Sequence, residues 1–287
     1  ANLITEPEGR DTAAAVTLAA ALIMTRTGSD ATMLVLPADH LIPDAAALRD
    51  TLTDCAAMAE QHQSLVAIGI PAAEPNPAYG YWQCGPPLPA ASSRTTFLEV
   101  GTFHEKPDTD TAARLIAAGN CFWNSGIFAW TTATLTAELH RHAPPFAAAI
   151  AAFQDAVRQD CLESVLAEFY PQLPRRSIDH ALLESARGTA VAVANFAWDD
   201  LGSWNALRRH LATTADGNAA TGQHVWLDCH NCLAVSDSNH LVAAIGVDDL
   251  VIVQSANATL VCRRNADQRL KELLQLVAAD PLLTRYL

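Results

Sequence analysis

Short apolar runs alternate with segments of helical periodicity over the first two-thirds of the chain. Two of these runs, Thr32 to Leu36 and Ser64 to Ile70, are bounded by polar or turn-forming residues, and each predicts a buried strand. Strands that alternate with helices are typical of an α/β domain. The pattern therefore predicts an α/β fold with a largely parallel sheet.

Polar residues in front of the helical segments predict where the helices begin. Asp44 is placed to cap a helix that runs to about Gln61, and either Asp11 or Thr12 is placed to cap an earlier helix through Met24. These residue types suit a first helical position because their side-chain oxygens accept a hydrogen bond from a free backbone N–H.

A further helix is predicted to open near Asp108 and to end at Gly119, with acidic residues at the positive end of its dipole. A proline-rich stretch that precedes this helix predicts a long irregular excursion out of the sheet. Its prolines are Pro71, Pro75, Pro77, Pro86, Pro87 and Pro89.

After about Thr214 the pattern changes to short strands separated by turns, which predicts a first domain at residues 1–213 and a small β-rich appendage at 214–287. A last helix carries a single apolar stripe that needs a surface to pack against. The stripe suits a homodimer interface and packing inside the chain equally well. The predicted strands are 224–228, 233–236, 241–245, 250–254 and 259–262, and the stripe is Leu270, Leu273, Leu274 and Val277.

The 287 residues are enough to bury one large core or two smaller ones. The chain has 18 Lys plus Arg against 31 Asp plus Glu, and the net charge of -13 argues against binding nucleic acid or an anionic membrane. A small-molecule partner fits this charge better. Lys106 and Lys271 are the only lysines, so a lysine inside a motif is less easily explained as an ordinary surface residue.

The longest apolar stretch, Ala13 to Met24, is too short to span a bilayer, and the N-terminal residues lack the basic start and apolar core of a secretory signal. We therefore expect a cytoplasmic protein.

The 7 cysteines are scattered and odd in number, which suits reduced thiols. Cys229 and Cys232 have CxxC spacing without a second pair at zinc-finger distance, so two small half-buried thiols of a strand are the favoured interpretation.

Acidic residues follow two of the predicted strands. Asp39 lies just past the strand that ends at Leu36, and Asp199 and Asp200 follow the apolar run 190–195. Ligands of open α/β sheets bind beyond the carboxyl ends of the strands, and Mg²⁺ is usually held by one or two carboxylates together with phosphate oxygens and water. These residues predict a metal site. The alternative is that each Asp caps the next helix, which is as good an interpretation for either residue alone.

Glu105, Lys106 and Asn124 are polar residues within apolar runs. This placement suits groups that hold sugar hydroxyls and a phosphate in a mostly apolar cleft. Gly80, between two tyrosines, would let the backbone approach a ligand closely. The alternatives are that Lys106 is a solvated turn residue and that Gly80 belongs to an ordinary turn.

The chain resembles the mannose-1-phosphate guanylyltransferases, a family of sugar-phosphate nucleotidyltransferases, over essentially its whole length. Each shared motif is weak alone, whereas seven motifs in the same order are specific. They are Glu6 to Ala13, Leu36 to His40, Tyr79 to Tyr81, Phe103 to Pro107, Trp123 to Gly126, Ser177 to Asp179 and Asp200 to Trp204.

The resemblance implies a Rossmann-like, GT-A-like nucleotidyltransferase fold, with a mixed sheet, helices on both faces, a small C-terminal β appendage and a final helix. It implies transfer of a guanylyl group from GTP to mannose 1-phosphate, which yields GDP-mannose and pyrophosphate, with Mg²⁺ as cofactor. The implied site residues are Asp39 and Asp200 for the metal; Lys106 with these two acids for catalysis; Glu6, Pro7, Arg10, Asp11, Thr12 and Asp39 for the nucleotide; and Gly80, Glu105, Lys106, Asn124 and Asp200 for the sugar phosphate.

The sequence departs from the family pattern at several points. Family members open with a strand and a Gly-rich loop that cradles the triphosphate, whereas no GxG occurs here, so the resemblance predicts an N-terminally incomplete fold. Asp11 stands where the family usually has Asn, Ala14 where it usually has Pro, and His104 where it usually has an aliphatic residue. An ionised Asp11 can only accept hydrogen bonds, so recognition of the base or ribose is expected to differ.

Three functional interpretations remain open. The first is an active guanylyltransferase, the second is a non-catalytic regulatory or interaction relative without the triphosphate loop, and the third is a nucleotidyltransferase for another hexose 1-phosphate or another nucleotide. A purely structural descendant would not need five retained polar groups, which favours the first. These groups are Asp39, Asp200, Glu105, Lys106 and Asn124.

Overall fold

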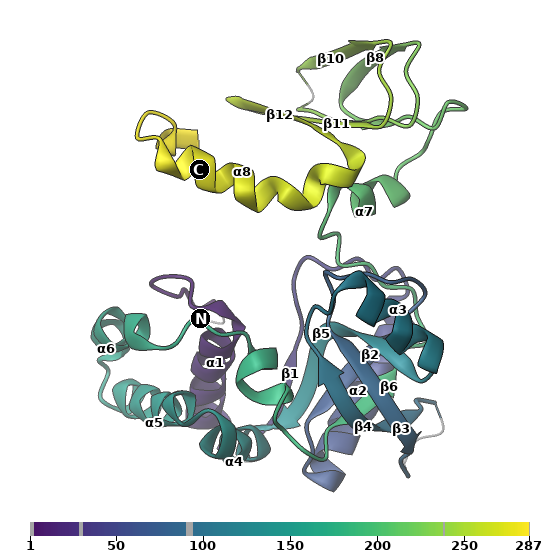
Figure 1. Ribbon diagram of the computed structural model, residues 1–287. Helices are drawn as coiled ribbons and strands as arrows, with labels where there is room; N and C mark the ends of the chain where they lie inside the picture. Colours follow the sequence, from purple (N-terminus) through teal and green to yellow (C-terminus); the bar gives the residue numbers. More distant parts are fainter. Residues whose placement is uncertain (1–2, 29–30, 90–93, 238, 287) are drawn as a thin grey trace. The chain divides into compact units, whose positions relative to one another are not determined.

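The computed structural model, drawn in Figure 1, describes residues 3–28, 31–89, 94–237 and 239–286. The contacts divide the chain into two compact units. The first unit comprises Ala1–Ala38 and Ile42–Trp198, and the second comprises Asp39–Leu41 and Asp199–Leu287. Residues 199–213, which the sequence pattern assigned to the first domain, group with the second unit by their contacts.

The first unit is built on a six-stranded mixed sheet with strand order β1-β5-β2-β6-β4-β3. Its strands are β1 (Thr32–Val35), β2 (Val66–Pro71), β3 (Tyr81–Pro87), β4 (Phe97–His104), β5 (Cys121–Thr131) and β6 (Ala190–Val193). Its helices are α1 (Asp11–Thr27), α2 (Ala45–His62), α3 (Thr109–Ala118), α4 (Thr132–His142), α5 (Pro144–Arg158) and α6 (Leu162–Phe169). Two short turns follow α6, the 3-10 turn η1 (Tyr170–Gln172) and the π-helical turn η2 (Asp179–Leu183).

The direction of the strands differs from the prediction. Among the pairings of this sheet that the structure describes, β2 and β6 run parallel, and the others are antiparallel. The expectation of a largely parallel sheet is therefore wrong, while the mixed sheet implied by the family resemblance is confirmed. An apolar run reports the burial of a strand and carries no information about its direction.

The proline-rich stretch also contains more regular structure than predicted. Strand β3 lies inside it and pairs with β4, so the stretch is not wholly an excursion from the sheet. Pro86 and Pro87 are the last residues of β3, which stands at the end of the strand order. Proline lacks a backbone donor and is tolerated at such edge positions.

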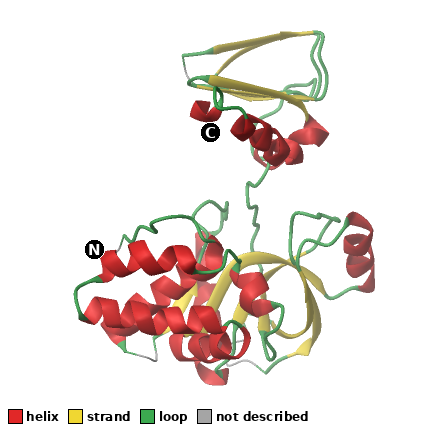
Figure 2. Ribbon diagram, turned by 60° about the vertical axis from the view of Figure 1, so that its left-hand side comes forward, coloured by secondary structure: helices red, strands yellow, loops and turns green. Residues whose placement is uncertain are grey.

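Helices cover both faces of the sheet, as expected. Phe128 and Trp130 of β5 pack with α1, α4 and α5, whereas Ile127 and Ala129, which alternate with them along the strand, pack with α2. This division follows from the alternation of side chains along a strand. Figures 1 and 2 show α1, α4, α5 and α6 gathered on one side of the first unit.

Two of the predicted helix starts are confirmed. Asp44 accepts hydrogen bonds from the N–H groups of Ala46 and Ala47 at the start of α2, and Asp108 accepts one from Thr111 at the start of α3. Each of these bonds occupies a backbone donor that has no partner within the helix.

Helix α1 differs from its prediction at both ends. It begins at Asp11 with Arg10 in the capping position and no side-chain cap, so neither Asp11 nor Thr12 plays the expected part. It also runs to Thr27 instead of Met24, and Gly28, at φ 98°, ends it. Glycine populates positive φ without a steric penalty, which makes it a common residue directly after a helix.

The second unit is mainly short strands in two ladders. In one, β7, β9 and β11 run parallel and β12 pairs antiparallel with β11, and in the other β8 and β10 run parallel. The five predicted strands are confirmed, while the three-residue β7 went unpredicted because it is too short to show a pattern. The strands are β7 (Ala219–Thr221), β8 (Gln223–Leu227), β9 (Leu233–Val235), β10 (Leu241–Ile245), β11 (Leu250–Ser255) and β12 (Ala258–Arg263). The helical segments are α7 (Trp204–Arg209), η3 (Arg264–Arg269), α8 (Leu270–Ala279) and η4 (Thr284–Tyr286).

Two details of the second unit correct the sequence predictions. Cys229 and Cys232 are free thiols and are fully buried instead of half-buried. No residue of α8 is buried by the part of the chain that the structure describes, and Leu273 and Leu274 of its apolar stripe remain 44% and 42% exposed. None of the described helices combines the length and apolar character needed to cross a membrane.

Candidate active site

The predicted sugar-phosphate residues of the first unit lie together at one end of the sheet. The start of β3 pairs with the end of β4 and with the part of β5 that carries Asn124. This register brings Gly80, which precedes β3, beside Glu105, which follows β4. The Asn124 N–H donates to the Gly80 carbonyl at 2.8 Å, so β5 is bonded directly to the residue that precedes β3.

Gly80 and Glu105 are in close contact. A Cβ atom on Gly80 would lie 2.6 Å from the Glu105 Oε2 atom, so a side chain at this position would displace the Glu105 carboxylate. Glu105 is nearly buried and pairs through Oε1 with Lys106 Nζ at 3.1 Å, whereas the Lys106 side chain is 62% exposed. Lys106 thus presents a cation beside a buried carboxylate and remains accessible to an anionic ligand.

Asn124 projects from an irregular part of β5. The register between β2 and β5 shifts between Ala67 and Gly69, opposite the residues that follow Asn124. Ser125 occupies this irregularity, where its hydroxyl donates to the Ile68 carbonyl at 2.7 Å and accepts from the Ile127 N–H at 3.2 Å. Such bulges redirect side chains and are frequent next to active sites.

Asp179 belongs to the same cluster, although it was not among the predicted site residues. Its Oδ1 accepts a hydrogen bond from Asn124 Nδ2 at 2.6 Å. Burial raises the pKa of Asp179, the Glu105 carboxylate raises it further, and the hydrogen bond from Asn124 acts in the opposite direction. The sequence signal was an acid placed between Ile178 and a run of apolar residues, at the end of a motif shared with the family.

The segment predicted to bind the nucleotide is attached to residues 170–178. Glu6 is hydrogen-bonded to the Tyr170 hydroxyl. Burial, and then this bond, raise the pKa of Tyr170. Arg10 forms an ion pair with Glu8 and donates to the Leu173 carbonyl at 3.3 Å.

The remaining residues of that segment have different surroundings. Thr12 Oγ1 accepts from the Ile178 N–H at 2.8 Å. Asp11 has φ of 66° and accepts from the Thr12 N–H at 2.7 Å, and both Asp11 and Pro7 are exposed. The structure therefore brings Glu6, Arg10 and Thr12 into one hydrogen-bonded region and leaves Asp11 and Pro7 on its surface.

Asp39 and Asp200, the two predicted metal ligands, fall in the second unit. A short antiparallel bridge joins Leu41 to Asp199, with N–H to carbonyl distances of 2.8 and 3.1 Å. This bridge brings the two segments together. Asp39 and Asp200 both interact electrostatically with His40, although burial is the larger effect and lowers the pKa of that histidine. Neither acid caps the helix after it, because Asp44 caps α2 and Ser203 caps α7, so the capping alternative is wrong.

Asp199 and Asp200 differ in their surroundings. Asp199 is buried, and its Oδ2 accepts from Arg209 at 2.8 Å and lies 2.9 Å from His210 Nε2. Burial opposes these bonds, yet together they lower the pKa of Asp199. Asp200 is partly exposed and accepts through Oδ1 from the Gly202 N–H at 3.0 Å. Asp199 is thus a structural anchor, and Asp200 is the acid that remains accessible.

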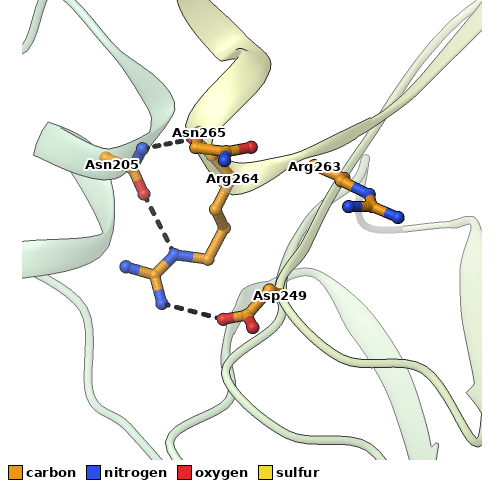
Figure 3. Close-up of a pocket in the computed structure, with 5 residues that line it drawn as sticks. All are labelled: Asn205, Asp249, Arg263, Arg264 and Asn265. Atoms are coloured by element: carbon orange, nitrogen blue, oxygen red, sulfur yellow. Dashed lines mark hydrogen bonds and ion pairs between the residues drawn. The ribbon is translucent and has the colours of Figure 1, made fainter.

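A separate polar pocket of about 400 Å³ lies in the second unit (Figure 3), and none of the predicted site residues lines it. Arg264 donates through Nε to Asn205 Oδ1 at 3.1 Å and lies 3.6 Å from Asp249, while Asn205 donates to the Arg264 carbonyl at 2.7 Å. Figure 3 shows Arg263 extending away from this group. These contacts connect α7 to the start of η3 and, through Arg264, to the residue before β11.

Comparison with known proteins agrees with this arrangement. The nucleotidyl transferase family profile matches residues 1–217, and the MannoseP isomerase/GMP-like beta-helix domain profile matches residues 222–276. The chain is 36% identical over 291 residues to a mannose-1-phosphate guanylyltransferase of Sinorhizobium fredii, covering 97% of this chain and 53% of that protein. It is also 36% identical over 273 residues to a xanthan biosynthesis protein of Xanthomonas campestris, covering 95% of this chain and 56% of the relative.

A solved structure is similar to most of the chain. The crystal structure described as a mannose-1-phosphate geranyltransferase from Thermus thermophilus matches with a TM-score of 0.80 and 32% identity, covering 96% of this chain and 78% of that one. The chain spans little more than half the length of the two curated relatives. It belongs to the nucleotidyl transferase family, and the relatives it resembles within that family include mannose-1-phosphate guanylyltransferases.

Proposed function

We propose that the protein transfers a guanylyl group from GTP to mannose 1-phosphate, giving GDP-mannose and pyrophosphate. The observation that carries the proposal is the cluster of Gly80, Glu105, Lys106 and Asn124 at one end of the sheet. It combines a close backbone approach, a carboxylate, a cation and an amide, which are the groups that bind sugar hydroxyls and a phosphate.

The reaction requires the protein mainly to align the two substrates and to neutralise charge on the phosphates. An oxygen of the sugar phosphate attacks the α-phosphorus of GTP, the bond from that phosphorus to the bridging oxygen breaks, and pyrophosphate leaves with the electron pair. Lys106, 62% exposed, is suited to orienting the attacking phosphate. Since the sugar phosphate is already a nucleophile, the reaction needs no covalent enzyme intermediate.

Asp39 and Asp200 would hold Mg²⁺, which when bound would neutralise charge on the phosphate oxygens. Both are carboxylates, the donor type that this ion prefers. The described residues contain no group of three or more His, Cys, Asp or Glu side chains able to hold a metal. Two protein carboxylates completed by phosphate oxygens and water fit this finding.

The test is pyrophosphate release by the purified chain with GTP, mannose 1-phosphate and Mg²⁺. Asp39→Asn and Asp200→Asn should abolish release, because each removes a charged metal ligand. Asp155→Asn is the matched control, since Asp155 lies on the surface of α5 and pairs only with Arg158 among described residues. Release that persists in the first two variants would contradict the assigned roles.

The same assay separates the other interpretations. A non-catalytic relative would bind GTP or mannose 1-phosphate without releasing pyrophosphate, which calorimetry detects. A different substrate preference would show as faster release with glucose 1-phosphate or ATP.

The proposal also includes the expectations that the protein is cytoplasmic, acts on small molecules and binds no nucleic acid. A homodimer through the exposed apolar stripe of α8 stays a prediction, which light scattering tests.

A further inference from the structure

We propose that Asp179 is a positioning residue, which fixes the amide of Asn124 so that this amide donates one hydrogen bond to the sugar phosphate. The inference rests on the proposed function, because it assigns the acceptor of that bond to the substrate. The hydrogen bond between Asp179 and Asn124 itself is a property of the protein alone and can be tested separately.

The chemistry of its neighbours determines the orientation of the Asn124 amide. Trp82 Nε1 and the Gly126 N–H lie 3.3 and 3.2 Å from Asn124 Oδ1, and both can only donate. The Asp179 carboxylate lies 2.6 Å from Asn124 Nδ2, and when ionised it can only accept. A flipped amide would place donor against donor and acceptor against acceptor, so one orientation satisfies all three neighbours.

Among the described residues, this orientation leaves one hydrogen of the Asn124 amide without an acceptor. Both lone pairs of Oδ1 are engaged, and one of the two Nδ2 hydrogens is given to Asp179. The remaining Nδ2 hydrogen can only be donated. The partner of Asn124 is therefore an acceptor, such as a phosphate or hydroxyl oxygen of the sugar phosphate, and cannot be a donor alone.

Asp179 is the strongest of the three contacts that hold the amide. Its bond is the shortest and involves a charged acceptor, whereas the two bonds to Oδ1 are longer. Without Asp179, neither amide hydrogen of Asn124 would have an acceptor in the described part of the chain, and the amide would be held loosely.

The position of Asp179 is set by the segment before it. The Ile178 N–H donates to Thr12 Oγ1 at 2.8 Å, and the Ala13 N–H donates to the Arg176 carbonyl at 3.2 Å. Asp179 then opens the π-helical turn η2, with one carboxylate oxygen directed at Asn124. The turn therefore connects the start of α1, where the nucleotide-binding residues are expected, to the proposed sugar-phosphate cluster.

The experiment compares Asp179→Ala, Asp179→Asn and Ser177→Ala. Asp179→Ala removes the acceptor and should raise the KM and Kd for mannose 1-phosphate about tenfold or more, with the KM for GTP unchanged. Asp179→Asn keeps an acceptor oxygen and should restore most of the affinity. Ser177→Ala is the control in the same turn, because its hydroxyl contacts only His180 among described residues, and it should behave like the unmodified protein.

The Asn124 side-chain amide signal in a ¹H–¹⁵N spectrum reports the hydrogen bond without any ligand. Asp179→Ala should shift this signal, whereas Ser177→Ala should not. If the KM values for both substrates rise together, or if Asp179→Asn is as impaired as Asp179→Ala, the positioning role is overturned. An unmodified protein that binds no mannose 1-phosphate would instead contradict the proposed function, and an unmoved amide signal would show that Asp179 does not hold Asn124.

Discussion

Gly80 packs against the carboxylate of Glu105 so closely that a Cβ atom at residue 80 would lie 2.6 Å from Glu105 Oε2 and 2.7 Å from the ring of Phe103. Phe103 packs on the main core of the first unit, so the ring has little room to yield. The side chain of Glu105 would have to move, which would disturb its ion pair with Lys106.

We therefore predict that Gly80→Ala lowers kcat/KM for mannose 1-phosphate by roughly tenfold to a hundredfold, since small displacements of positioning groups have effects of this size. Gly85→Ala, also in β3, is the control, because its Cβ would meet nothing closer than 3.7 Å. Steady-state pyrophosphate release measures both. Equal activity of the two variants would contradict the role given to the contact.

The contact between Gly202 and Asp200 predicts an effect on metal binding. A Cβ at Gly202 would lie 2.7 Å from Asp200 Oδ2, so Gly202→Ala should displace this carboxylate. We expect the Mg²⁺ concentration for half-maximal activity to rise roughly tenfold, as is common when a group that orients a metal ligand is disturbed. A magnesium titration of pyrophosphate release tests this. An unchanged requirement would argue against Asp200 as a ligand.

Ser125 predicts a measurable loss of stability. It is buried and bonds to the backbone of both Ile68 and Ile127, so Ser125→Ala leaves these groups unsatisfied. The free energy of unfolding should fall by about 1–3 kcal/mol. Urea unfolding followed by tryptophan fluorescence measures the change. Thr53→Ala, which removes an exposed hydroxyl bonded within α2, should change the value by less than about 0.5 kcal/mol.

The raised pKa of Asp179 predicts a pH-dependent difference in stability. Burial makes the ionised carboxylate costly, so the contribution of this group to stability is greatest at low pH and is lost as the pH rises through the raised pKa. Asp179→Asn should therefore melt above the unmodified protein at pH 8. The difference should shrink as the pH falls toward the ordinary aspartate pKa of about 4.

Asp108 provides a control for this measurement, because its substitution should change the melting temperature in the opposite direction. Its pKa is lowered, first by the hydrogen bond from the Thr111 backbone at the start of α3. The stability it contributes is present above the ordinary pKa and is lost as the pH falls through the lowered one, so Asp108→Asn should melt below the unmodified protein at pH 8. Calorimetric melting temperatures between pH 4 and 8 compare both variants. Differences of the same sign would contradict the assignment for Asp179.

Local chemistry made much of the fold predictable. Asp44 and Asp108 cap their helices as predicted, because capping depends on residues two or three positions away. The short strands after Thr214 were also predicted, since turn residues and apolar runs mark them directly. The family motifs further indicated that Gly80, Glu105 and Asn124 belong to one site.

The tertiary structure decided the features that depend on distant residues. The direction of the strands follows from their pairing, which an apolar run does not encode. Asp199 and Asp200 are neighbours in sequence, yet only Asp199 is buried against Arg209 and His210. The bond between Asn124 and Asp179 joins residues 55 positions apart, and no local pattern specifies such a contact. The sequence by itself determined where α2 and α3 begin and which polar residues stand out, whereas folding determined which of those residues touch.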